Sequence, residues 1–246
     1  MRRFQPQLHK GQPLHAGAVH LYHFLFSDLI SHQTELHAIL SPAEQSRAAR
    51  LRFPAPRTRF ILARGLLREL LGRYLDVPPA ELRFSYNPHG KPTLATPAHA
   101  WLHFNLSHSE EMVLLAFTSD RPLGVDVEQI HPVQKMERLV ERFFSPAERV
   151  AFRALPDGQR EAAFFAGWTR KEAYIKGRGL GLALPLHQFD VTLEPQKARL
   201  LADRQTPAAV GRWTLRSLDF IPGYAAALAV RGEIAEIVRW ADSRIV

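Results

Sequence analysis

The chain has 246 residues, enough for one large domain or two small ones with a buried core. Hydrophobic residues make up 46% and charged residues 23%, an ordinary globular balance, and no apolar run approaches the roughly 20 residues that cross a bilayer. The absence of cysteine excludes disulfides, thiolate catalysis and cysteine zinc sites. No apolar segment follows the basic N-terminus, so we expect no secretory signal, and the absence of cysteine fits a cytoplasmic location.

The net charge of +8 predicts attraction to polyanions. Nucleic acid, anionic lipid, a phosphorylated cofactor and an acidic protein all satisfy this requirement. Charge alone does not choose among them.

The first half of the chain alternates between patterns typical of strands and of helices. Ser41-Pro42-Ala43-Glu44 indicates a helix start, because serine caps, proline fits the first turn and glutamate can complete a capping box. Residues 59–74 predict an amphipathic helix, and residues 87–90 predict a turn. The strands predicted here are His20–Phe26, Leu82–Tyr86, Trp101–Asn105 and Met112–Thr118.

The second half repeats this order after a linker predicted at residues 119–122. Ser145-Pro146-Ala147-Glu148 indicates another capped helix start, and residues 160–176 predict a long helix. The glycines of residues 177–181 are expected to end that helix and to bring backbone close to a ligand. The strands predicted here are Leu123–Glu128, Phe189–Leu193, Trp213–Leu218 and Tyr224–Val230.

The two halves match each other in element order and spacing. The two capped helix starts correspond, and at the same offset Phe60 corresponds to Phe164 and Ala63 to Gly167. Chance is the alternative, since proline-initiated helices are common. We interpret the pattern as an α+β fold of two similar α/β subdomains, residues 1–120 and residues 121–246, related by a pseudo-two-fold axis. A cleft between such halves is a natural ligand site.

Gly124-Val125-Asp126-Val127-Glu128 carries two carboxylates on one strand. Side chains alternate along a strand, so Asp126 and Glu128 share a face, roughly 6.5–7 Å apart. Two carboxylates on a rigid face can hold a hard divalent cation. A half-buried strand with a solvated polar face is the simpler alternative.

The predicted helix over residues 160–176 has a second set of reactive side chains. Phe164, Trp168, Glu172 and Lys176 recur every four residues and therefore share one helix face. A carboxylate that continues an aromatic, buried stripe needs a partner, which a metal ion or Lys176 can supply. The alternative is an ordinary surface pair between Glu172 and Lys176.

Asp126, Glu128, Glu172 and Lys176 together offer three carboxylates and a cation, which suits a site for magnesium and phosphate. Residues 104–109 and the lysine of Gly90-Lys91-Pro92 add groups that can donate to phosphate. Ser107 and His108 do not form a nucleophilic pair by pattern, because no Gly-x-Ser-x-Gly elbow surrounds them.

In combination these motifs resemble the surfactin-type 4′-phosphopantetheinyl transferases, whose hallmarks look like Gly-Ile/Val-Asp-x-Glu and Trp-x-x-Lys-Glu-x-x-x-Lys. The resemblance runs from about residue 41 to about residue 193 and includes the segments Gly90–Pro92, Phe104–Ser109, Gly124–Glu128, Arg142–Ser145, Trp168–Lys176 and Gly179–Leu182. It implies the 4′-phosphopantetheinyl transferase fold of two similar halves, with coenzyme A bound between them and the metal site in the second.

The resemblance also implies roles for individual residues. Asp126, Glu128 and Glu172 would bind Mg²⁺, and Lys176 would contact the transferring phosphate. The cofactor's phosphates and nucleotide would be contacted by Ser107, His108 and Lys91, and by Arg47 and Arg59, which are chosen by alignment offset among several arginines although Glu44 is acidic where a positive charge is expected. Either Glu172 or a metal-bound water would accept the proton of the carrier serine.

The implied reaction moves phosphopantetheine from coenzyme A to a serine of an acyl or peptidyl carrier protein and releases adenosine 3′,5′-bisphosphate. Fatty-acid, polyketide and peptide synthesis all use such carriers, and the sequence does not choose among them. We expect a monomer without membrane or nucleic-acid partners. The competing interpretations are a basic nucleic-acid-binding module, a magnesium-dependent phosphohydrolase and a catalytically silent carrier-binding protein.

Overall fold

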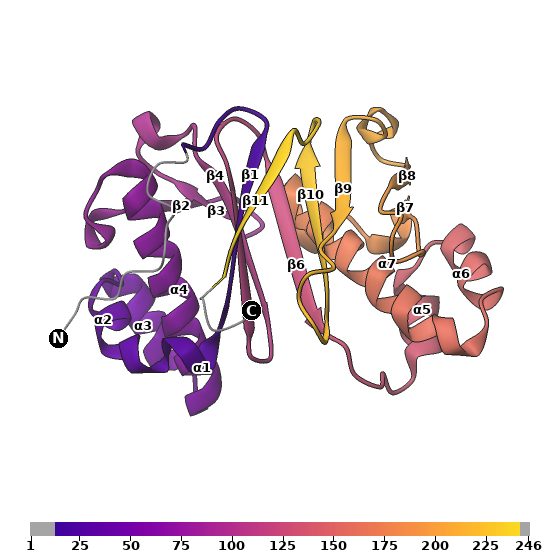
Figure 1. Ribbon diagram of the computed structural model, residues 1–246, viewed down its shortest axis with the longest axis horizontal. Coiled ribbons are helices and arrows are strands. Elements are labelled where there is room, and N and C mark those ends of the chain that lie inside the picture. The colour runs from indigo at the N-terminus through magenta and orange to yellow at the C-terminus, as the bar shows by residue number, and fades with distance from the viewer. Residues whose placement is uncertain (1–12, 242–246) are drawn as a thin grey trace.

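A computed structural model describes residues 13–241, in which two α/β halves lie side by side (Figure 1). The elements of the first half are β1 (Ala18–Leu25), α1 (Phe26–Leu29), α2 (Gln33–Ala38), α3 (Pro42–Arg50), α4 (Pro54–Leu75), β2 (Phe84–Tyr86), β3 (Pro92–Leu94), β4 (His103–Ser109) and β5 (Met112–Thr118). Those that follow are β6 (Leu123–Gln129), α5 (Met136–Phe143), α6 (Pro146–Arg153), α7 (Asp157–Arg178), β7 (Phe189–Val191), β8 (Leu200–Asp203), β9 (Trp213–Ser217), β10 (Tyr224–Arg231) and β11 (Glu236–Ala241).

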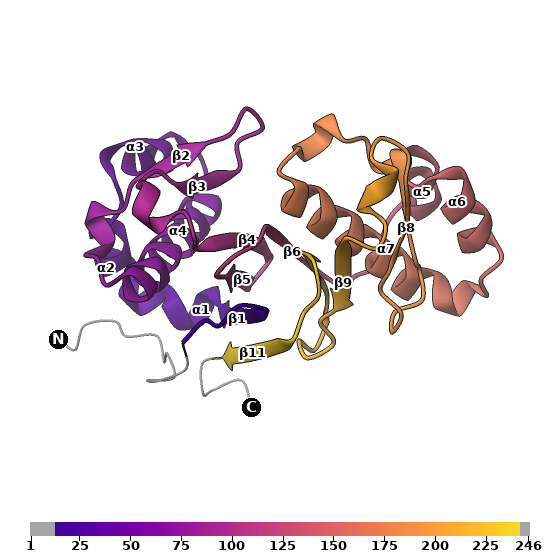
Figure 2. The same ribbon diagram turned by 90° about the horizontal axis from the view of Figure 1, so that it is seen from above.

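Two sheets form the middle of the molecule, and the long helices cover their outer faces (Figures 1 and 2). The strand order is β11-β1-β5-β4 in the first sheet and β6-β10-β9 in the second. Apolar side chains between the sheets form a shared core, which includes Val19, Leu21, Leu114, Val125, Val127 and Leu228. The two halves are therefore held together by hydrophobic burial.

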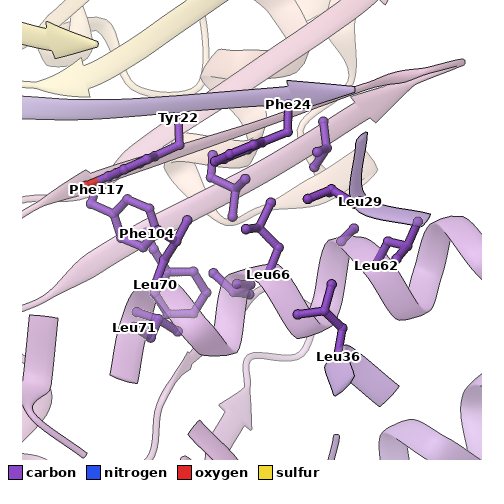
Figure 3. Packing of buried hydrophobic residues seen from close by; sticks show 14 of the residues in the cluster. Tyr22, Phe24, Leu29, Leu36, Leu62, Leu66, Leu70, Leu71, Phe104 and Phe117 are labelled. Atoms are coloured by element: carbon purple, nitrogen blue, oxygen red, sulfur yellow. The ribbon is translucent and has the colours of Figure 1, made fainter. Parts of the chain in front are cut away.

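The core of the first half lies between its sheet and α4 (Figure 3). Tyr22 and Phe24 point from β1 toward the helix, where Leu66 and Leu70 meet them. Alternation along the strand and the four-residue repeat along the helix place these side chains on facing surfaces. Burial of such side chains contributes roughly 1.5–3 kcal/mol each.

The duplication predicted from the sequence extends to buried ion pairs. Both capping boxes form, and each places a buried glutamate, Glu44 or Glu148, at the start of a helix. Arg68 of α4 donates to Glu44 at 2.7 Å and to the carbonyl oxygens of Pro79 and Leu82. Lys171 of α7 makes the same set of contacts, with Glu148 at 2.7 Å and with the carbonyl oxygens of Leu186 and Phe189.

This correspondence corrects the residue matching within the long helices. Pro54 corresponds to Asp157 and Leu75 to Arg178, so the offset is one residue smaller here than at the capping boxes. Phe60 therefore corresponds to Ala163, whereas the sequence pattern paired it with Phe164. The capped helices account for this difference, since α3 has 9 residues and α6 has 8, whereas the loops that follow them are equally long.

Several element boundaries differ from the sequence predictions. Helix α4 begins at Pro54 instead of residue 59, because proline fits the first helical turn. Strand β4 was predicted to end at Asn105 but continues to Ser109, so its polar residues 105, 107 and 109 all lie on one face. The prediction did not include α1, α2, α5, β3, β8 or β11.

The division of the chain at residue 120 stays a prediction, and one later segment crosses it. Strand β11 returns to the first sheet and pairs in parallel with β1, from Ala18 opposite Glu236 to His23 opposite Ala241 (Figure 2). In the part of the chain that the structure describes, no helix combines the length and apolar character needed to cross a membrane.

Candidate functional site

Strands β4 and β6 and helix α7 meet where the two halves join. Gly124 allows this approach, because a Cβ atom there would lie 2.1 Å from the carbonyl oxygen of Ala173 and 2.3 Å from the amide nitrogen of Gly177. Any side chain at this position would push β6 away from α7. The glycine that opens the acidic motif thus brings its carboxylates next to the helix that carries Glu172 and Lys176.

Side chains of β4 connect the two sheets at this junction. Asn105 accepts the amide hydrogen of Val125 at 2.9 Å, Ser107 donates to Asp126 at 2.9 Å, and Ser109 donates to Glu128 at 2.9 Å. The Ser109 hydroxyl also accepts from the Gln129 amide. Residues 105, 107 and 109 of β4 therefore hold β6 in position. Two of them lie beyond residue 105, where the sequence patterns predict β4 to end.

Asp126 lies at the centre of the site and is only 2% exposed. Its Oδ1 accepts hydrogen bonds from the ammonium of Lys176 at 2.6 Å and from Ser107. Its Oδ2 is buried and has no hydrogen-bond partner among residues 13–241. Burial raises the pKa of Asp126, while Lys176 and Ser107 act in the opposite direction. The solvated polar strand face considered from the sequence is therefore excluded.

Glu128 and Glu172 face the same space. Burial and then the charge of Asp126 raise the pKa of Glu128, against the effect of the Ser109 hydrogen bond. The pKa of Glu172 rises to about 7, first through burial and then through Asp126, with a smaller effect of Glu128. The charge of Asp126 thus raises the pKa of both glutamates, as expected where carboxylates lie near one another. Lys176 contacts Asp126, so the simple surface pair with Glu172 is not what this structure shows.

The donors at this site fit a hard cation in type. All three are carboxylates, the ligands that Mg²⁺ and Ca²⁺ prefer, and the unpartnered Oδ2 of Asp126 can accept a metal bond. Within residues 13–241, no group of three acidic or histidine side chains lies at metal-binding spacing in this conformation. Lys176 lies 2.6 Å from Asp126 and supplies a positive charge beside this buried carboxylate.

A cavity of about 800 Å³ lies between α3, α4, the β2–β3 hairpin and β4, the strand that also carries Ser107. Four exposed or half-buried arginines line it, together with His108 and the aromatic rings of Phe60, Phe84 and Tyr86. The arginines are Arg47, Arg50, Arg64 and Arg83. Arg64 lies over the ring of Phe84 and donates to the Tyr86 hydroxyl at 2.7 Å. Such a surface favours an anion that carries an aromatic or planar group.

Most of the described chain matches known protein families. Residues 27–120 match the description "4′-phosphopantetheinyl transferase, N-terminal", and residues 122–229 match "4′-phosphopantetheinyl transferase superfamily". The 4′-phosphopantetheinyl transferase HetI of Nostoc sp. is 40% identical over 215 residues, which cover 87% of this chain and 88% of the relative. The chain belongs to the 4′-phosphopantetheinyl transferase superfamily.

Two further relatives carry the same family name. The 4′-phosphopantetheinyl transferase Sfp of Bacillus subtilis is 31% identical over 193 residues, 78% of this chain and 82% of the relative. The 4′-phosphopantetheinyl transferase psf-1 of Bacillus pumilus is 33% identical over 199 residues, 80% of this chain and 81% of the relative. These matches confirm the membership in the 4′-phosphopantetheinyl transferase family that the sequence motifs indicated.

The structure brings most of the predicted site residues of this superfamily member together. Ser107, Asp126, Glu128, Glu172 and Lys176 converge at the junction described above. His108 and Arg47 line the neighbouring cavity. The roles proposed for these residues stay predictions.

Two predicted cofactor contacts lie elsewhere. The guanidinium of Arg59 contacts Glu110 at 3.1 Å and Glu111 at 3.2 Å in the turn between β4 and β5, outside the described lining of the cavity. Gly90 and Pro92 belong to the described lining of the cavity and Lys91 does not; its ammonium donates to three backbone carbonyl oxygens of the second half. For both residues, contact with a cofactor stays a prediction.

The sequence patterns did not single out Arg50, Arg64 or Arg83. A signal for Arg64 existed, since it follows Phe60 by one helical turn and shares its face. Its proximity to Phe84 and Tyr86 depends on how the hairpin folds back, which the sequence pattern does not show.

Proposed function

We propose that this chain transfers 4′-phosphopantetheine from coenzyme A to a serine of an acyl or peptidyl carrier protein. The products are the holo carrier protein and adenosine 3′,5′-bisphosphate. The observation that carries the proposal is the convergence of Asp126, Glu128, Glu172 and Lys176 beside an arginine-lined cavity, in a chain of this superfamily.

The internal duplication supports the arginine-lined cavity as the cofactor site. A second cavity of about 640 Å³ lies at the equivalent place in the second half, between α6, α7 and β7. Ala43 and Glu44 in the first cavity correspond to Ala147 and Glu148 in the second, but Arg47 is replaced by Ala151. No arginine lines the second cavity within the described residues. Of these two cavities, the first therefore suits the pyrophosphate and 3′-phosphate of coenzyme A.

We assign the residues of the junction the following roles in the transfer reaction. The carrier serine oxygen attacks the β-phosphorus of coenzyme A, and the bond between that phosphorus and the bridging oxygen of the adenosine bisphosphate breaks. In this proposal Lys176 and Ser107, which hydrogen-bond to each other beside Asp126, donate to phosphate oxygens, and Glu172 accepts the serine proton. A divalent cation held by Asp126, Glu128 and Glu172, which we propose is Mg²⁺, would supply positive charge next to the pyrophosphate.

The proposed substrates also account for the surface charge. A net charge of +8 attracts both a polyanionic cofactor and an acidic carrier surface, chiefly by accelerating their association. The candidate site takes Ser107 from the first half and Asp126 and Lys176 from the second half of one chain, so we propose a monomer, which light scattering in solution tests. A cytoplasmic location is proposed with it, because coenzyme A and the carrier proteins are found there.

Intact-mass spectrometry of an apo carrier protein tests the function. After incubation with this chain, coenzyme A and Mg²⁺, the carrier should gain one phosphopantetheine, and Asp126→Ala should abolish the gain. Release of phosphate without modification of the carrier would favour a phosphohydrolase instead. Tight duplex DNA binding without any response to coenzyme A would favour a nucleic-acid-binding module.

A further inference from the structure

The turn between β2 and β3 is built around Asn87. Its side-chain oxygen accepts the backbone amide hydrogens of His89 at 3.0 Å and of Lys91 at 2.9 Å, and its backbone N–H donates to the Lys91 carbonyl oxygen. Gly90 adopts a positive φ of 82°, which lets the chain reverse here. The hairpin extends from the first half toward the second (Figure 2). The turn is therefore ordered by its own hydrogen bonds before any contact with the other half is considered.

This turn contacts the second half at the end of α7. The Lys91 ammonium donates to the carbonyl oxygens of Lys176 at 2.7 Å, Leu123 at 3.0 Å and Gly177 at 3.1 Å. The amide of the Asn87 side chain donates to the Gly179 carbonyl oxygen at 2.6 Å. Leu123 begins β6, so one ammonium group joins the start of the acidic strand to the end of the helix.

The chemistry of these contacts is well matched. The last carbonyl oxygens of a helix lack partners within the helix and form the negative end of its dipole, where a cation is stabilising. An ammonium group has three donors, and all three find a carbonyl oxygen here. Burial lowers the pKa of Lys91 to about 8, which leaves the group mostly protonated at neutral pH.

The contacted positions belong to the candidate site. One of the three carbonyl oxygens is that of Lys176 itself, and Leu123 lies on the strand that carries Asp126. Gly90 and Pro92, on either side of Lys91, line the cavity. A displacement of this turn would therefore move the Lys176 backbone relative to Asp126.

We propose that Lys91 and Asn87 are positioning residues, which hold the last turn of α7 and the start of β6 so that Lys176 stays aligned with Asp126. This inference rests on the proposed function for its effect on turnover. It differs from a direct contact between Lys91 and a cofactor phosphate, because the three donors of the ammonium are already engaged with backbone.

Three variants separate these roles. Lys91→Met keeps the length of the side chain without the charge. Asn87→Asp keeps the oxygen that accepts from His89 and Lys91 but loses the donor to Gly179. His89→Ala changes an exposed side chain of the same turn and serves as the control.

Kinetics of carrier loading provide the first measurement. For Lys91→Met and Asn87→Asp we expect kcat to fall about 10–100-fold, because a displacement of about 1 Å in a reacting group costs this much. The Kd and KM for coenzyme A should stay within about twofold of wild type, because neither side chain binds the cofactor. His89→Ala should keep wild-type values.

Hydrogen exchange provides a measurement that does not depend on catalysis. Amide exchange over residues 175–179 should accelerate in Lys91→Met and Asn87→Asp, while exchange in the core helix α4 stays unchanged. If wild type fails to load any carrier, the proposed function fails, yet the exchange result still tests the positioning contact. A Kd for coenzyme A raised more than about tenfold with kcat and exchange unchanged would overturn the inference in favour of a phosphate contact. Unchanged kinetics and exchange in both variants would also overturn it.

Discussion

The ammonium of Lys176 lies 2.6 Å from Oδ1 of Asp126, while the other oxygen of this buried carboxylate has no hydrogen-bond partner among residues 13–241. Lysine and aspartate come from different elements, α7 and β6, which meet because Gly124 leaves no side chain between them. The hydrogen bond between Lys176 and Asp126 therefore requires that α7 and β6 pack against each other.

Removal of the Lys176 charge should destabilise the metal-free protein. Lys176→Met leaves Asp126 buried without its cation, and we expect a loss of about 1–3 kcal/mol in the free energy of unfolding measured with urea. Asp126→Asn in the same chain should restore part of this loss, because the unpaired charge is then absent. A double-mutant cycle with no coupling between the two positions would contradict the role of the pair.

Cation binding should depend on the acidic strand and on its hydrogen-bond partner in β4. We expect titration calorimetry of the metal-free chain to show Mg²⁺ binding that Asp126→Asn abolishes. Ser109→Ala should weaken it by about 10–100-fold, because Glu128 loses the hydroxyl that orients it. Ser85→Ala, in the exposed β2–β3 hairpin, is the control. Equal affinity in Ser109→Ala and Ser85→Ala would show that Glu128 is not oriented by Ser109.

The close approach of β6 and α7 predicts a strong effect of one added methyl group. Gly124→Ala would place a Cβ 2.1 Å from the Ala173 carbonyl oxygen, and we expect a loss of about 1–3 kcal/mol or more in stability together with lost activity. Gly158→Ala is the matched control in α7, since its Cβ would meet no atom within 4 Å. It should be neutral or slightly stabilising, because alanine favours helix over glycine. Thermal unfolding of the two variants compares them directly.

Stability should fall in mild acid because of a buried histidine. Burial and then His15 lower the pKa of His20 from 6.5 to about 4 in the folded chain. Between these values the unfolded state binds more protons, so the free energy of unfolding decreases as the pH falls from 6.5 to 4, by up to about 3 kcal/mol from this group. Urea unfolding near neutral pH and near about pH 5 should show a smaller loss for His20→Gln than for wild type. An identical pH dependence of the two proteins would contradict this prediction.

The arginines of the first half should contribute unequally to coenzyme A binding. Arg47→Ala removes a cation from the cavity lining, and we expect the Kd for coenzyme A to rise about 10–100-fold, as for loss of a hydrogen bond to a charged group. Arg59→Ala should have a smaller effect, because Glu110 and Glu111 already bind its guanidinium. Fluorescence or calorimetric titrations measure both. A larger effect of Arg59→Ala would support the alignment with the family over the geometry described here.

The sequence by itself determined the features that depend on neighbours along the chain. Both capping boxes, the ordering of strands and helices, the shared face of Asp126 and Glu128, and the glycine end of α7 at Gly179 follow from local hydrogen bonds and side-chain periodicity. The same regularity exposed the duplication, and the combined motifs identified the family.

Tertiary structure decided the contacts between residues that are far apart in sequence. The pairing of β11 with β1, the contact of Lys91 with the end of α7, and the choice of Lys176 for Asp126 over Glu172 each join segments from different parts of the chain. No local pattern encodes them, because they depend on how the sheets pack and on where the hairpin folds back. For the same reason sequence patterns could propose Arg47 and Arg59 equally, and only packing placed the first in the cavity and the second against Glu110.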